Sequence, residues 1–351
     1  MFVSDTLIRW YEKNKRDLPW RQTKDPYRIW LSEVILQQTR VAQGMSYYHR
    51  FLELFPDIIS LADAPEPAVL KAWQGLGYYR RARNLHIAAR HIRDFCQGVF
   101  PRQHADILAL KGVGEYTAAA IASFAFDLPH PVVDGNVNRF VSRYFGVDVP
   151  VDSGKGKKQI LLCVDEIFDR SAPAIFNQAI MEFGSLVCSP APSCMACPLA
   201  DSCHAFRHRM TSVLPRKSKA KTPVQRYFHY FLVDTPKELF IRHRTEDDIW
   251  KNLYDLPLIE TPDASVSPFE TDDLKMYFGN APIQAMQPLV HMEHKLTHRT
   301  IHAFFYRIAY RIDYPMSSAQ RIPFSDFSHY PVPVLIQKFF ERHADELLTT
   351  R

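Results

Sequence analysis

A basic stretch without apolar periodicity, RHRMTSVLPRKSKAKTPVQR at residues 207–226, divides the 351-residue chain into two parts of different character. Before it, apolar residues recur at helical spacing; after it, aromatic and aliphatic runs have the length of strands. We therefore expect a multidomain protein, with an all-α domain at 1–206, a basic linker at 207–226 and a smaller α+β domain at 227–351.

The periodicity predicts the main elements of both domains. Helices are expected at residues 3–15, 28–38, 45–55, 67–73, 82–97, 117–125, 137–144, 157–168 and 174–187. In the second domain, residues 227–233 and 239–243 are expected to form a β-hairpin through the connection DTPKE. A further strand is expected at 301–310 and a helix at 334–343.

The positive charge is concentrated in the first part of the chain. Residues 1–226 carry 30 Lys and Arg against 21 Asp and Glu, whereas residues 227–351 carry 13 against 17. The cations gather in clusters at 80–83, 155–158 and 216–221. This asymmetry suits a polyanionic partner such as DNA, although solvated helix faces would give the same balance.

No apolar run is long enough to cross a bilayer, and the N-terminal residues lack the order of a signal peptide. We therefore expect a cytoplasmic protein without membrane contact. In that compartment the six cysteines are expected to be metal ligands or free thiols.

Four of the cysteines lie within sixteen residues, in the pattern C-x5-C-x2-C-x5-C: Cys188, Cys194, Cys197 and Cys203. Four thiolates on one loop can surround a metal centre, and soft sulfur ligands select zinc or iron–sulfur. The spacing predicts a metal site and leaves these two alternatives open.

One carboxylate, Glu33, stands beside the apolar stripe of the helical stretch WLSEVILQQTR. Periodicity allows two interpretations, a solvated edge residue or an acid held in a pocket. A second carboxylate, Asp134, directly precedes a helix in VVDGNVNRFVSRYF and is expected to be its N-cap. The helix end would then keep this group ionised.

The turn Lys111–Gly114, KGVG, lies between two helices, the second of which is rich in alanine. Two glycines permit a tight turn that presents backbone N–H groups at a helix N-terminus, which is typical of a phosphate site. A plain helix hairpin would also use glycines here. We interpret the segment as a helix–hairpin–helix that binds DNA phosphate without reading bases.

Together these features resemble the MutY-type adenine DNA glycosylases of the helix–hairpin–helix superfamily. The matching segments occur in the family's order: LPWR, WLSEVILQQTRV, WQGLGYYRRARNLH, LKGVGEYTAAAI, VVDGNVNRF, FNQAIMEFGSLVC and the cysteine loop. They cover residues 18–203. The resemblance implies a hydrolase that flips adenine out of duplex DNA when it is mispaired with 8-oxoguanine or guanine.

The resemblance also implies roles for individual residues. Glu33 matches the acid that protonates adenine N7, and Asp134 the carboxylate that stabilises the sugar cation or bonds to it transiently. Tyr116 matches a tyrosine hydrogen-bonded to the Asp134 carboxylate, and Asn136 a further polar partner. The residues that match the adenine pocket are Trp20, Arg21, Leu36 and Gln178. Those that match DNA contacts are Gln38 and Tyr78, which wedge into the base stack, with Thr39, Gly112 and Gly114.

This chain departs from related sequences of the superfamily at two points. Endonuclease III-type enzymes place a Schiff-base lysine where this chain has Tyr116, which disfavours a bifunctional lyase. The family's cysteine loop usually has six residues in its first interval, and this chain has five. The resemblance still implies a structural [4Fe–4S] cluster on Cys188, Cys194, Cys197 and Cys203.

The second domain resembles the Nudix-like C-terminal domain of the same family. After Leu256 it lacks the Arg- and Glu-rich metal-binding helix of a working pyrophosphohydrolase, so recognition is expected rather than hydrolysis. Phe327, Ser328 and His329 match a tripeptide that senses 8-oxoguanine, with Ser328 as the main base contact. The expected partner is double-stranded DNA containing 8-oxoguanine:adenine mispairs, bound by a monomer. The alternatives are a bifunctional lyase and a non-enzymatic DNA-binding protein of the same fold.

Overall fold

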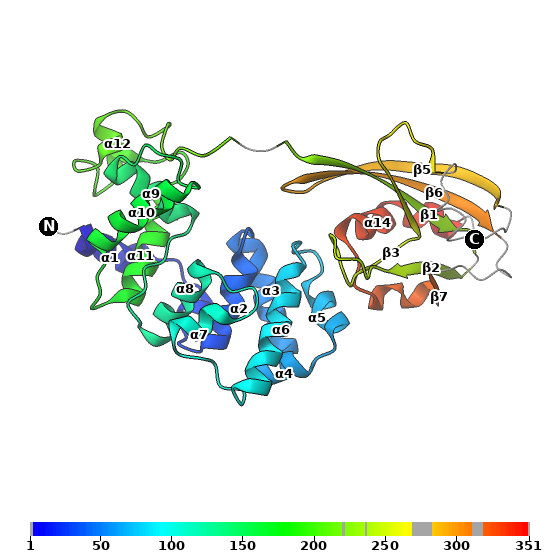
Figure 1. The fold of residues 1–351 in the computed structure, drawn as a ribbon, viewed down its shortest axis with the longest axis horizontal. Coiled ribbons are helices and arrows are strands. Elements are labelled where there is room, and N and C mark those ends of the chain that lie inside the picture. The colour runs from blue at the N-terminus through cyan, green and yellow to red at the C-terminus, as the bar shows by residue number, and fades with distance from the viewer. Residues whose placement is uncertain (1–2, 220–221, 236, 269–282, 311–318, 350–351) are drawn as a thin grey trace. The chain divides into compact units, whose positions relative to one another are not determined.

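The computed structural model describes residues 3–219, 222–235, 237–268, 283–310 and 319–349 (Figure 1). The chain forms two compact units. The first contains Met1–Asp63 and Ile87–Ala220, and the second contains Ala64–His86 and Lys221–Arg351. The second unit thus includes a helical segment from the first part of the sequence. The domain limits at 206 and 226 remain predictions.

The first unit is helical. Its helices are α1 (Val3–Asn14), α2 (Pro26–Leu36), α3 (Val41–Leu54), α4 (Ile58–Asp63), α7 (His104–Ala109), α8 (Glu115–Phe126), α9 (Gly135–Phe145), α10 (Gly154–Ile167), α11 (Pro173–Leu186) and α12 (His204–Arg207). The second unit adds α5 (Glu66–Trp73), and α6 (Arg80–Phe95) begins in the second unit and ends in the first. All nine expected helices are present, with ends shifted by a few residues.

Helix α2 is apolar on almost every side. It begins with Pro26 after Asp25, whose side chain accepts a 2.9 Å hydrogen bond from the Tyr27 N–H. Eight of its eleven residues are buried. A helix that is apolar on most sides lies inside a domain, and Glu33, one of the eight buried residues, is removed from water.

One hydrophobic core of the first unit brings together its N-terminal helix and its last long helices. Leu7 and Tyr11 of α1 pack with apolar residues of α9, α10 and α11, including Phe140, Ile160 and Phe183. The α1–α11 contact brings Arg16, just after α1, beside α11. Among the described residues, no helix combines the length and apolar character needed to cross a membrane.

The second unit contains two sheets. The larger has the order β4-β1-β6-β5, formed by β4 (Leu258–Thr261), β1 (Val224–Val233), β6 (Arg299–Tyr310) and β5 (Ile283–Lys295). Its central pair, β1 and β6, is parallel, and both edge strands are antiparallel to their neighbours. The smaller, antiparallel sheet has the order β3-β2-β7, formed by β3 (Tyr254–Asp255), β2 (Glu238–His243) and β7 (Gln320–Pro323).

The expected hairpin between β1 and β2 is wrong. Both edges of β1 are hydrogen-bonded, to β4 on one side and β6 on the other, so no edge remains for β2. Strand β2 belongs to the smaller sheet instead. The expected strand at 301–310 and helix at 334–343 are confirmed as β6 and α14 (Val334–Thr349).

Helix α14 packs on the larger sheet, where the rings of Phe339 and Phe305 stack at 4.0 Å. The segment Ala64–His86 joins the same unit through polar contacts. The Tyr79 hydroxyl donates to the Val332 carbonyl at 3.1 Å, and Lys71 Nζ donates to the Tyr330 carbonyl at 3.1 Å.

Candidate active site

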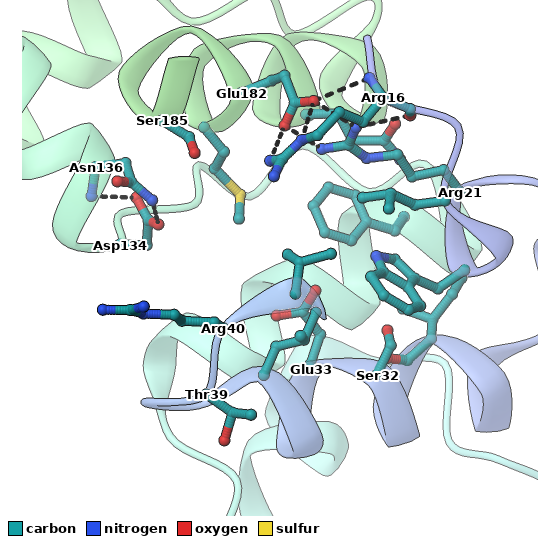
Figure 2. Close-up of a pocket in the computed structure, with 18 of the residues that line it drawn as sticks. Arg16, Arg21, Ser32, Glu33, Thr39, Arg40, Asp134, Asn136, Glu182 and Ser185 are labelled. Atoms are coloured by element: carbon teal, nitrogen blue, oxygen red, sulfur yellow. Dashed lines mark hydrogen bonds and ion pairs between the residues drawn. The ribbon is translucent and has the colours of Figure 1, made fainter. Parts of the chain in front are cut away.

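A cavity of about 510 Å³ lies in the first unit (Figure 2). It gathers residues from α2, α8, α9 and α11 and from the loops between helices. All the predicted catalytic and adenine-pocket residues line it, together with one predicted DNA contact: Glu33, Asp134, Tyr116, Asn136, Trp20, Arg21, Leu36, Gln178 and Thr39. Segments up to about 160 residues apart in sequence therefore meet in one site.

Glu33 projects into this cavity from α2, with only 7% of the residue exposed. Burial, together with the nearby carboxylate of Asp134, raises the pKa of its carboxyl group to a net value of about 7. A hydrogen bond from Tyr116 and the charge of Arg21 act in the opposite direction. Periodicity left Glu33 as either a solvated edge residue or an acid in a pocket, and the structure has it in the pocket.

Asp134 reaches the same cavity from the start of α9, as Figure 2 shows. Its Oδ1 accepts hydrogen bonds from the Asn136 and Val137 N–H groups at 2.8 and 2.7 Å, which confirms the N-cap. Its Oδ2 accepts from the Asn136 amide at 2.7 Å. Burial raises the pKa of Asp134 above its ordinary value, and these hydrogen bonds oppose the rise. Capping alone therefore does not set its ionisation.

The expected hydrogen bond between Tyr116 and Asp134 is wrong. The Tyr116 hydroxyl donates to Glu33 Oε2 at 2.7 Å. Helices α2 and α8 pack directly on each other, which brings the Tyr116 hydroxyl to Glu33. The groups that donate to Asp134 all belong to the first turn of α9, namely the Asn136 and Val137 N–H groups and the Asn136 amide. Asn136 is thus the polar partner of Asp134, as expected.

A third carboxylate of the cavity, Glu182, is buried and was not singled out from the sequence. It lines the cavity from α11 and accepts five hydrogen bonds, from the backbone N–H and guanidinium of Arg16 and the guanidinium of Arg21, at 2.6 to 3.0 Å (Figure 2). Burial raises its pKa, but the two guanidinium groups outweigh burial and hold it at about 2. The sequence did carry a signal, because Glu182 is the single charge in PAIFNQAIMEFGSL.

Predicted DNA contacts outside the cavity have distinctive backbone geometry. Gln38 and Tyr78 adopt positive φ angles of 58° and 50°, in the left-handed region that is unusual for side chains of this size, and both are exposed. In the hairpin between α7 and α8, Gly112 has φ 81°. Gly114 caps α8 with extended backbone, and a Cβ there would meet nothing within 4 Å.

The four loop cysteines line a second, small cavity with apolar neighbours such as Phe140, Phe183 and Phe206. The buried guanidinium of Arg143 donates to the Ser189 carbonyl at 2.7 Å and to Cys188 Sγ at 3.6 Å. Within the described ranges, no three His, Cys, Asp or Glu residues are arranged around a single metal-ion position. Four thiols around one small cavity, one of them hydrogen-bonded to a guanidinium, fit a thiolate-ligated group with negative charge.

In the second unit, the predicted tripeptide lies on the 3₁₀ helix η4 (Phe324–His329). Phe327 is half-buried and packs on Phe340 of α14 at 4.6 Å, whereas Ser328 and His329 are exposed. One residue anchors the turn and two face solvent.

Comparisons with known proteins agree with this geometry. Residues 31–165 match the HhH-GPD superfamily of base excision DNA repair proteins, and residues 229–342 match the NUDIX domain. The adenine DNA glycosylase of Buchnera aphidicola from Schizaphis graminum is 32% identical over 85% of this chain and 85% of its own length. That of Buchnera aphidicola from Acyrthosiphon pisum is 30% identical over 96% of each chain.

Solved structures match the helical part. A thermostable thymine-DNA glycosylase has a TM-score of 0.54 at 28% identity, over 58% of this chain and 95% of its own. A trapped endonuclease III–DNA covalent intermediate, at 23% identity and a TM-score of 0.51, covers 59% of this chain and 95% of its own and shares the fold. The two-domain match and the near full-length relatives place this chain in the MutY-type family of adenine DNA glycosylases.

Proposed function

We propose that this chain hydrolyses the N-glycosidic bond of adenine mispaired with 8-oxoguanine in double-stranded DNA. The observation that carries the proposal is the pair of carboxylates in one cavity, Glu33 with a pKa raised to about 7 and Asp134 capped on α9. Glycoside cleavage needs one protonated acid and one ionised carboxylate, and different environments separate the two.

Glu33 is the acid of this pair. With a pKa near 7, a large fraction of Glu33 carries a proton at neutral pH, and the acid can protonate adenine N7 as the bond breaks. Asp134 is the ionised partner, because three hydrogen-bond donors face its oxygens. It stabilises the oxocarbenium-like sugar until water completes hydrolysis.

The flipped base enters the remaining space of the cavity. Trp20 and Leu36 supply apolar walls, and Arg21 and Gln178 supply polar groups at fixed positions. Arg21 is held by two hydrogen bonds to Glu182, at 3.0 and 2.8 Å. Such preorganised groups recognise a base by its edge, and Gln38 and Tyr78 are each proposed to wedge into the base stack.

Hydrolysis without a lyase step fits the lining of the cavity. Within the described chain, the residues around it include Arg16, Arg21 and Arg40 but no lysine. Tyr116 occupies the position of the lyase lysine, and Asn138 donates to the Asp134 carbonyl at 2.9 Å. An amine that would form an imine with the sugar is therefore missing from this lining.

The cysteine loop and the second unit complete the proposal. Cys188, Cys194, Cys197 and Cys203 would hold a [4Fe–4S] cluster, which supplies structural stability to the loop rather than electrons. Ser328 and His329, exposed beside the anchored Phe327, would recognise 8-oxoguanine in the opposite strand. The enzyme would act on DNA as a monomer.

An oligonucleotide duplex with 8-oxoguanine opposite adenine tests the proposal. The wild type should yield a base-free site, and Glu33→Gln should lose about 10²–10⁴-fold in rate. Glu53→Gln, a change at an exposed carboxylate of α3, is the matched control and should retain full activity. Binding without any base-free product in the wild type would favour the non-enzymatic alternative, and a borohydride-trapped adduct would favour the lyase.

A further inference from the structure

Two basic clusters that lie about 60 residues apart in sequence meet on the surface of the first unit. Residues 214–219 lie along the segment that precedes α10. The Val151 N–H donates to the Arg216 carbonyl at 3.0 Å, and Ser218 N–H donates to Asp152 at 2.9 Å. Arg216 also forms an ion pair with Asp148.

This docking creates a surface of five exposed lysines: Lys155, Lys157, Lys158, Lys217 and Lys219. We call it the lysine surface. No hydrogen bond or ion pair of these lysine side chains is recorded within the described part of the chain. Of the nearby carboxylates, Asp148 pairs with Arg216, and Asp152 accepts hydrogen bonds from Ser218 while the charge of Lys217 also acts on it. The five lysines and Arg216 outnumber these two carboxylates. The lysine surface therefore carries a net positive charge that is not used in packing.

The third basic cluster of the sequence shows the contrast. Arg81 stacks over the Trp73 ring at 5.1 Å, and burial lowers its pKa to about 10. Arg83 donates to the Lys251 carbonyl. These arginines stabilise the second unit, so a basic cluster in this chain does not by itself indicate a binding surface.

Helix α9 separates the active site from the lysine surface along the chain. Asp134 lies in the cavity at the start of α9, and the segment that carries the lysine surface follows the end of α9. An eleven-residue helix is about 16 Å long, which corresponds to about five base pairs at 3.4 Å per step. A duplex engaged at the cavity extends over this distance.

We propose that the lysine surface binds backbone phosphates of the duplex about five or more base pairs from the mispair, without reading sequence. This inference rests on the proposed function, since it takes DNA as the substrate. Lysine is a compact cation suited to phosphate contacts that carry no base information. Leu162, 63% exposed, lies one turn beyond Lys158, so an acidic protein is the competing partner.

The test uses the full-length protein with Lys155→Gln, Lys157→Gln and Lys158→Gln combined. Affinity for an undamaged 30-base-pair duplex is measured against salt concentration. Each lost phosphate contact lowers the slope of log K against log salt by about 0.9, so the triple variant should lose about 2 to 3. Single-turnover excision at saturating DNA should be unchanged.

A second pair of variants gives a matched comparison. Lys217→Gln with Lys219→Gln should reduce the slope by about 2, whereas Arg9→Gln with Lys13→Gln, at exposed positions of α1, should leave it unchanged. On a duplex that ends three base pairs from the mispair, wild type and lysine variants should bind equally. The length dependence distinguishes a specific surface from a general loss of charge.

An unchanged salt slope in both lysine variants would overturn the inference. So would a lost affinity for polyglutamate with DNA binding intact, which would assign the surface to an acidic protein. Failure of the proposed function is a separate result, because it would appear as missing base-free product in the wild type at any salt concentration.

Discussion

The Tyr116 hydroxyl donates a 2.7 Å hydrogen bond to Glu33 Oε2 and so joins α8 to the acid of the cavity. A donor stabilises the ionised form of a carboxyl group, and this bond lowers the pKa of Glu33 against the effect of burial. Tyr116 thus limits how far the acid's pKa rises. The pKa of Glu33 therefore depends on Tyr116, Asp134 and Arg21 as well as on burial.

Tyr116→Phe should therefore raise the pKa of Glu33 beyond about 7. Because the proposed reaction needs protonated Glu33, excision falls as pH rises through this pKa, and the variant should show the fall at higher pH. The pH profile of single-turnover excision measures the shift. Tyr27→Phe removes another buried hydroxyl bond, to the Phe55 carbonyl, and should keep the wild-type midpoint. Coincident midpoints for all three proteins would contradict this role of Tyr116.

Glu33 should also make stability depend on pH. Its folded pKa of about 7 lies above the ordinary value of 4.5, so its contribution is fully present below pH 4.5 and is lost as pH rises through 7. At pH 8 the buried charge costs roughly 3 kcal/mol. Glu33→Gln should therefore be more stable than the wild type at pH 8 and similar at pH 4.5. Chemical unfolding at the two pH values measures the difference in unfolding free energy between the variant and the wild type. The same difference at both pH values would argue against a desolvated Glu33.

Glu182 should have the opposite pH dependence. Its folded pKa of about 2 lies below 4.5, so its stabilisation is present above pH 4.5 and is lost as pH falls through 2. Glu182→Gln would leave the guanidinium groups of Arg16 and Arg21 without their anion, at a cost of about 3–5 kcal/mol at pH 7. The difference in unfolding free energy between Glu182→Gln and the wild type should be smaller at pH 3. A variant as stable as the wild type at pH 7 would mean that the arginines find other partners.

The cysteine loop gives a prediction that is independent of catalysis. Cys197→Ser should lose iron and acid-labile sulfide in protein prepared without oxygen, because a [4Fe–4S] cluster needs four thiolates. Cys163→Ser, at a lone cysteine of α10, should retain both. Stoichiometric zinc in the wild type would exclude the cluster.

Periodicity predicted the helices well because nearly all of them bury one face. It also marked Glu33, as a lone carboxylate beside an apolar stripe. It did not predict the partner of Tyr116, since side-chain direction across α2 and α8 decides which carboxylate a hydroxyl reaches. Applied to α11, the same lone-charge argument would have found Glu182.

The strands were harder to predict from the sequence. Alternating and aromatic runs indicate that β1 and β2 are strands, but a short connection between them suggested a hairpin. Pairing depends on which edges other strands occupy, and β6, from about 70 residues later, takes the edge of β1. The local sequence of β1 and β2 does not indicate which strand will occupy the edge of β1.

Gly184 of α11 lies against the first turn of α9, next to the Asn136 backbone. A Cβ added there would lie 2.7 Å from the Asn136 carbonyl oxygen and 2.9 Å from its carbon, so the backbone of Asn136 must move. Asn136 donates two hydrogen bonds to Asp134, and the carboxylate should move with it.

Gly184→Ala should reduce single-turnover excision about 10- to 100-fold, because small displacements of a reacting group are costly. DNA affinity should stay close to the wild-type value, since the change does not touch the hairpin of α7 and α8. Gly154→Ala is the matched control, because a Cβ there meets nothing within 4 Å. If both glycine variants excise adenine at the wild-type rate, then the position of Asp134 does not depend on the close approach of α11 to the Asn136 backbone.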